Sequence, residues 1–99
     1  MMKLTLHVFY ASMGFYQSAL TAAQELAAER PELELRSWDV FAAPAAEMRE
    51  HHIHSYPTVR FFADGVLCGD STQVNWGKPS LARWIYEGLK QLYPARKEM

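Results

Sequence analysis

The chain has 99 residues, of which 49% are hydrophobic and 13% aromatic, and its net charge is -1. This length and apolar content predict a single domain over residues 1–99 with its own hydrophobic core. The balanced charges form no basic stripe, which argues against nucleic acid and anionic membranes as partners. The sequence contains no signal-peptide pattern. It also contains no apolar run that approaches the roughly 20 residues of a membrane-spanning helix. The one cysteine, Cys68, agrees with a reducing compartment, and we expect a cytoplasmic protein.

The first part of the chain predicts a strand, a helix and a second strand. Polar and apolar residues alternate from Leu4 and the run becomes continuously apolar up to Tyr10, which indicates a strand. The segment Phe15–Glu29 is rich in Ala, Leu, Gln and Glu with apolar residues at helical spacing, and Pro31 ends this helix. The segment Leu33–Val40 supplies the second strand.

The second part predicts a short helix, a hairpin and a long helix. Pro44 followed by Ala-Ala-Glu-Met-Arg-Glu is typical of a helix with proline in its first turn. Strands Thr58–Ala63 and Val66–Gly69 flank Asp64-Gly65, a dipeptide that favours a tight hairpin because both residues accept positive φ. Pro79 opens the last helix, whose apolar stripe consists of Leu81, Trp84, Ile85, Leu89 and Leu92.

The predicted order of elements is therefore β-α-β-α-β-β-α, which makes this an α/β protein. A crossover helix between the first two strands implies that they are parallel, and the hairpin adds an antiparallel edge. We expect a mixed four-stranded sheet with helices on both faces.

Several segments in this order resemble the thioredoxin family across nearly the whole chain. They are Val8-Phe9-Tyr10-Ala11 before the first helix, Asp39-Val40 followed by Pro44, Ile53-His54-Ser55-Tyr56-Pro57-Thr58-Val59, then Phe61-Phe62 and Asp64-Gly65. The Tyr-Pro-Thr segment is the most specific, because thioredoxins and protein disulfide isomerase domains carry a similar segment before a Phe-containing strand. The resemblance implies a thioredoxin-like fold.

The resemblance also implies a binding groove beside Pro57. In the family this proline follows a cis peptide bond, which exposes backbone groups of the preceding residue to an extended partner segment. Tyr56, Pro57 and Thr58 would line one side of the groove. The expected binding residues from the start of the first helix are Met13, Phe15 and Tyr16.

The active-site positions of the family depart from its pattern here. Alignment on Val8-Phe9-Tyr10 places the Cys-x-x-Cys motif at Gly14, Phe15, Tyr16 and Gln17, so neither cysteine is present. The buried aspartate of many thioredoxins falls at Val8, and the tryptophan before the first cysteine becomes Met13. Because disulfide exchange requires a thiolate, this site has no catalytic residues for it, and a redox-inactive protein that binds a protein or an extended peptide is the leading hypothesis.

Two other hypotheses remain open. The protein could be a monothiol or thiol-disulfide exchange enzyme that uses Cys68, its only possible redox group. Tyr10 and Ser12 could hold glutathione or another small thiol, as a hydroxyl does in glutathione transferases, which share this fold in one domain.

The histidines His51, His52 and His54 are close in sequence but have no second ligand pair nearby. A zinc site needs three or four ligands of defined geometry, so a solvated helix end is the better interpretation. We expect no metal and no cofactor.

Overall fold

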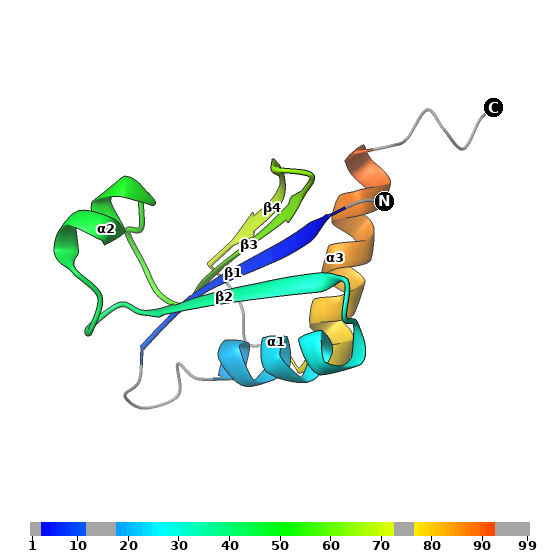
Figure 1. Ribbon diagram of the computed structural model, residues 1–99, viewed down its shortest axis with the longest axis horizontal. Coiled ribbons are helices and arrows are strands. Elements are labelled where there is room, and N and C mark those ends of the chain that lie inside the picture. Colours follow the sequence, from blue (N-terminus) through cyan, green and yellow to red (C-terminus); the bar gives the residue numbers. More distant parts are fainter. Residues whose placement is uncertain (1–2, 12–17, 73–76, 93–99) are drawn as a thin grey trace.

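The computed structural model describes residues 3–11, 18–72 and 77–92. Four strands form one mixed sheet in the order β2-β1-β3-β4 (Figure 1). Strand β1 (Leu4–Tyr10) is parallel to β2 (Leu33–Asp39) and antiparallel to β3 (Thr58–Ala63). Strand β3 turns into β4 (Val66–Ser71) through Asp64 and Gly65, which both have positive φ, as the hairpin prediction requires.

The helices are α1 (Ser18–Glu29), α2 (Ala45–Glu50) and α3 (Lys78–Leu92). The predicted order of elements is thus confirmed. Strand β4 extends two residues beyond the predicted end at Gly69, and α3 begins one residue before Pro79. The predicted start of the first helix at Phe15 lies outside the described residues.

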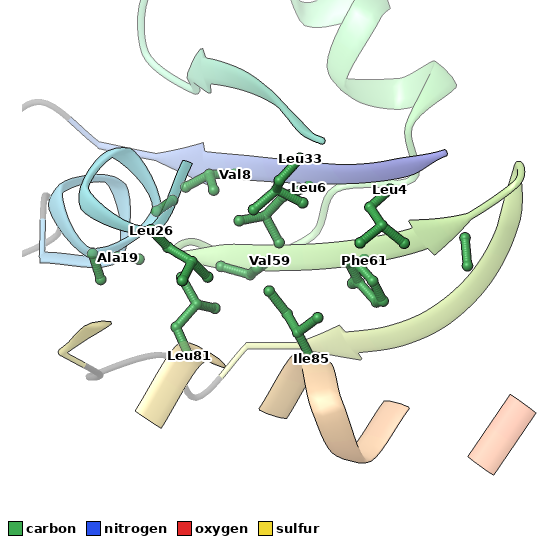
Figure 2. Close-up of a cluster of buried hydrophobic side chains, with 13 residues drawn as sticks. Leu4, Leu6, Val8, Ala19, Leu26, Leu33, Val59, Phe61, Leu81 and Ile85 are labelled. Carbon is green, nitrogen blue, oxygen red and sulfur yellow. The ribbon is translucent and has the colours of Figure 1, made fainter. Parts of the chain in front are cut away.

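One face of the sheet carries the main core, covered by α1 and α3 (Figure 2). Alternate residues of β1 point to this face and are almost fully buried, as the period of a strand requires. Together with apolar residues of β3 and of both helices they form one cluster: Leu4, Leu6, Val8, Leu26, Val59, Phe61, Leu81 and Ile85. Burying each large side chain contributes about 1.5–3 kcal/mol, so this layer holds the sheet and the two helices together.

The other face is covered at one end only. Helix α2 lies at one end of the sheet, on the left in Figure 1, and on this face His51 at its C-terminal end contacts the rings of Phe9 and Trp38. Thr5, His7 and Phe62 on the rest of this face stay partly exposed. Helices therefore lie on both faces, as predicted, but cover them unequally.

Within the described segments, none of the helices is both long enough and apolar enough to cross a membrane.

Candidate functional site

The loop before β3 contains the proline that the family resemblance points to. The Tyr56-Pro57 peptide bond is cis. Thr58 is only 3% exposed, and its hydroxyl donates a hydrogen bond of 2.7 Å to the carbonyl oxygen of Ser55. The Thr58 side chain therefore closes the loop and is not offered to a partner, unlike its neighbour Tyr56.

Two aromatic side chains are exposed together at this loop. Tyr56 is 40% exposed and Phe41 is 59% exposed, and their ring centroids are 5.2 Å apart in an edge-to-face arrangement. This geometry is one that aromatic pairs prefer. We call Phe41 and Tyr56 the aromatic pair, and it places exposed apolar surface beside Pro57.

The turn after β2 places Phe41 beside Tyr56. A carboxylate oxygen of Asp39 accepts the Phe41 N-H at 3.1 Å, and the Asp39 carbonyl accepts the N-H groups of Ala42 and Ala43. Phe41 is not among the binding residues predicted from the sequence. The available signal was a large apolar residue in a turn, where nothing in the local pattern requires one.

The Arg60 side chain connects the C-terminal end of α2 to the sheet. The Arg60 guanidinium on β3 donates to the carbonyl oxygens of His51 and His52, the latter at 3.3 Å, and lies 3.3 Å from an Asp70 carboxylate oxygen. It also sits 5.6 Å from the centroid of the Phe9 ring. His52 has a φ of 56°, the left-handed conformation in which helices commonly end. Because only 15% of the Arg60 side chain is exposed, its contacts replace most of its hydration.

An aromatic cluster supports the same attachment. The Trp38 ring stacks on Phe9 at 4.6 Å, and its Nε1 donates to a Glu47 carboxylate oxygen at 2.6 Å. The His51 ring lies 4.8 Å from Trp38. His51 is thus half-buried, although the sequence suggested a solvated helix end. The segment from Trp38 to Tyr56, which carries the aromatic pair, is held to the sheet near both of its ends.

His7 occupies the middle of the less covered face. Its ring centroid is 4.7 Å from Phe62, 5.1 Å from Trp38 and 6.2 Å from His51. Burial lowers the pKa of His7 below its ordinary value of 6.5, and the nearby His51, Arg36 and Arg60 lower it further, against a raising effect of Glu34. The imidazole is therefore mainly neutral at pH 7.

The remaining predicted site residues are not part of the aromatic pair. Ser12, Met13, Gly14, Phe15, Tyr16 and Gln17 lie outside the described residues. Tyr10 packs against the core cluster, and its carbonyl accepts the Val40 N-H at 2.8 Å. Val8, at the position of the family's buried aspartate, is completely buried among apolar neighbours.

Cys68 lies far along the sheet from Pro57. It is on β4 near the hairpin turn, and its Sγ contacts the Val66 carbonyl oxygen at 3.3 Å. Helix α3 passes close to it, because a Cβ added at Gly88 would lie 3.2 Å from the Cys68 carbonyl oxygen. Cys68 is partly buried. Since Pro57 precedes the opposite end of β3, about 16 Å of strand separates the two positions.

Residues 3–11, 18–72 and 77–92 contain no group of three or more His, Cys, Asp or Glu side chains that could hold a metal ion.

Neither a protein-family model nor a curated protein matches the sequence. Solved structures do match. Thioredoxin from Fasciola hepatica superposes with a TM-score of 0.70 at 23% identity, covering 87% of this chain and 81% of that chain. A mutant thioredoxin from Halobacterium salinarum has a TM-score of 0.69 at 23% identity, covering 86% and 74%. Thioredoxin O2 from Arabidopsis thaliana has a TM-score of 0.70 at 17% identity, covering 85% and 73%. The chain therefore has the thioredoxin fold.

Arg60→Met should lower the free energy of unfolding by about 2–3 kcal/mol, because two carbonyl groups and one carboxylate lose their charged donor. Urea unfolding followed by circular dichroism measures the change. Arg36→Met is the matched control, since Arg36 is exposed and pairs only with Glu34 among the described residues. The control should change the stability by less than about 0.5 kcal/mol. Equal losses in both variants would contradict the anchoring role of Arg60.

The lowered pKa of His7 predicts a pH-dependent stability. Below pH 6.5 the unfolded chain binds a proton at His7 more readily than the folded chain does, so stability falls as the pH drops from about 7 through 6.5 towards the lower folded pKa. Above that range this contribution is fully present. Urea midpoints measured between about pH 7.5 and about pH 5, on both sides of the ordinary imidazole pKa, should decline less in His7→Gln than in wild type. The exposed His54→Gln variant should behave as wild type, and an unaltered decline in His7→Gln would exclude this origin.

Proposed function

We propose that this thioredoxin-fold protein binds a protein or an extended peptide segment at the aromatic pair beside Pro57, and that it does so without thiol chemistry. The observation that carries the proposal is the exposure of Phe41 and Tyr56 next to each other at this loop. Large aromatic side chains that stay exposed in a small protein are common centres of binding energy in interfaces.

The contacts that hold α2 to the sheet keep the loops of the aromatic pair ordered before a partner binds. The Trp38-Glu47 hydrogen bond holds the first turn of α2 to the sheet, and Arg60 holds its C-terminal end, so the loops carrying Phe41 and Tyr56 lose little freedom when a partner docks. In the thioredoxin family the backbone before the proline pairs with an extended partner. The same mode here would put partner side chains against the two rings.

The sequence supports the absence of dithiol chemistry. Gly14 and Gln17 stand at the positions of the two family cysteines, and the chain has one cysteine in total. A single thiol cannot resolve a mixed disulfide within the same molecule. The position of Cys68 on β4, beside α3 and distant from Pro57, also separates it from the proposed binding surface. A single cysteine and a nearly neutral charge fit a cytoplasmic setting.

Substitution of the aromatic pair should weaken peptide binding. Peptides selected on the wild-type protein from a random display library serve as the probe, and calorimetry measures their affinity. Phe41→Ser and Tyr56→Ser should each cost about 1–3 kcal/mol of binding free energy, because each removes exposed aromatic contact area. Tyr86→Ser on α3 is the matched control, since Tyr86 is 58% exposed but lies on a different element. Thermal melts establish that the variants are folded.

Retained affinity in both folded variants would place the peptide site elsewhere and overturn this proposal.

The protein should not catalyse disulfide reduction. Insulin reduction by dithiothreitol, followed by turbidity, should proceed at the reagent's own rate when the protein is added, because no resolving thiol exists. Cys68→Ser should give the same trace as wild type. Acceleration by the wild type that disappears in Cys68→Ser would favour the monothiol enzyme instead.

A further inference from the structure

The less covered face of the sheet contains a depression of about 230 Å³. It lies near the hairpin turn, at the end of the sheet away from Pro57. Thr5, His7 and Phe62 are its more buried lining residues. Lys3, just before β1, and Glu34 and Arg36 on β2 also line it. The depression is separate from the aromatic pair and independent of the proposed peptide binding.

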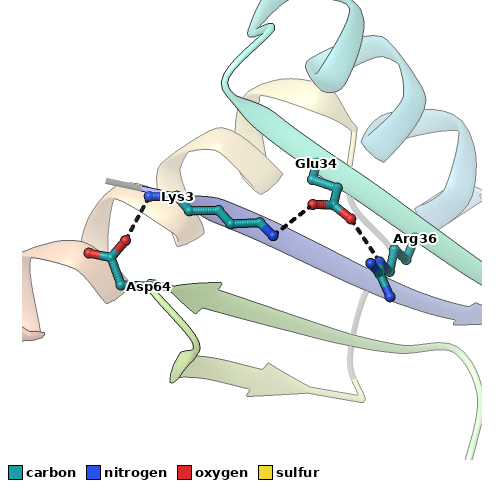
Figure 3. Close-up of polar contacts among 4 residues, drawn as sticks. All are labelled: Lys3, Glu34, Arg36 and Asp64. Carbon is teal, nitrogen blue, oxygen red and sulfur yellow. Dashed lines mark hydrogen bonds and ion pairs between the residues drawn. The ribbon is translucent and has the colours of Figure 1, made fainter. Parts of the chain in front are cut away.

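The lining carries two cations for one carboxylate. Lys3 Nζ lies 3.4 Å from one Glu34 carboxylate oxygen, and Arg36 Nε donates to the other at 2.8 Å (Figure 3). Hydrogen bonds from Arg36 and then Lys3 lower the pKa of Glu34, so its carboxylate is ionised at neutral pH. Asp64, at the corner of the hairpin, accepts the backbone N-H of Lys3 at 2.8 Å and is not part of the lining. The lining itself therefore has one positive charge in excess.

The two cations can reach a second anion. Arg36 uses Nε for Glu34, and a guanidinium has five N-H donors in a planar fork. The side chains of Arg36 and Lys3 are 59% and 67% exposed, so water still reaches both charged groups. A ligand carboxylate or phosphate can replace this water and form charge-assisted hydrogen bonds.

The deeper part of the depression is lined by two aromatic rings and is weakly polar. The rings of His7 and Phe62 are 4.7 Å apart, and the lowered pKa of His7 leaves its imidazole mainly neutral. Aromatic faces of this kind accept another flat ring. The volume is below the roughly 300–1,000 Å³ of pockets for drug-sized ligands, which limits the ligand to about one ring with its anionic group.

From this charge and shape we infer that the depression binds a small organic anion in which a carboxylate or phosphate is attached to a single flat ring. The anion contacts Arg36 and Lys3, and the ring lies against His7 and Phe62. Neither the aromatic pair nor Cys68 takes part.

Titration of the isotope-labelled protein by NMR tests the inference. Benzoate and phenyl phosphate, used as separate probes, should shift the amide signals of Thr5, His7, Arg36 and Phe62. Benzyl alcohol has the ring without the charge, and acetate and inorganic phosphate have the charge without the ring. Acetate should bind more weakly than benzoate, and inorganic phosphate more weakly than phenyl phosphate. Benzyl alcohol should bind more weakly than both aromatic anions. The two aromatic anions also distinguish a carboxylate site from a phosphate site.

Arg36→Gln should reduce the affinity for the preferred aromatic anion by about three- to fivefold, the effect of one exposed charged contact. The matched control is Lys90→Gln on α3, which should leave the affinity unchanged. Shifts centred outside the lining, equal binding of benzyl alcohol, or full affinity in a folded Arg36→Gln variant would each overturn the inference. Loss of peptide binding at the aromatic pair would not affect it.

Discussion

The Arg60 guanidinium joins three strands of the sheet to the end of α2. From the middle of β3 it reaches Asp70 on β4, the Phe9 ring on β1 and two carbonyl groups at the end of α2. A cation this far removed from water is costly unless its hydrogen bonds are satisfied, and here backbone and carboxylate oxygens satisfy them. The Trp38-Glu47 hydrogen bond, the ring contacts of His51 and the buried Met48 side chain hold α2 in the same position.

The surface differs in burial and charge between the part of the sheet that α2 covers and the part that it leaves uncovered. Where α2 meets the sheet, Phe9 is completely buried under Trp38, His51 and Arg60. The loops on either side of α2 carry Phe41 and Tyr56 to the surface. Further along the same face no helix of the described segments covers the strands, and Lys3, Glu34 and Arg36 line a depression there. Figure 3 shows the ion pairs of these three side chains. The main core on one face thus leaves part of the other face exposed.

Elements with strong local signals were predictable from the sequence. The alternation from Leu4 to Tyr10, the Asp64-Gly65 turn and the proline before α2 each fix a backbone conformation through nearby residues, and the corresponding elements are observed. These signals were sufficient for the order of elements and for the thioredoxin resemblance.

The side chains that matter for the candidate site were less predictable. Arg60 lies between the apolar residues Val59 and Phe61, and a charged residue in that alternation ordinarily faces water. Its burial depends on carbonyl groups from a helix end and a carboxylate from another strand, which only the tertiary structure brings together. Phe41 likewise belongs to the site because Tyr56, fifteen positions away by residue number, packs against it.

The most direct test of binding without thiol chemistry is an NMR map of the labelled protein with a peptide selected from the display library. The proposal predicts that the largest amide shifts occur around Phe41 and Tyr56, and that Cys68→Ser gives the same map and the same affinity under reducing conditions. Shifts centred on β4 around Cys68, or loss of peptide binding in Cys68→Ser, would contradict it.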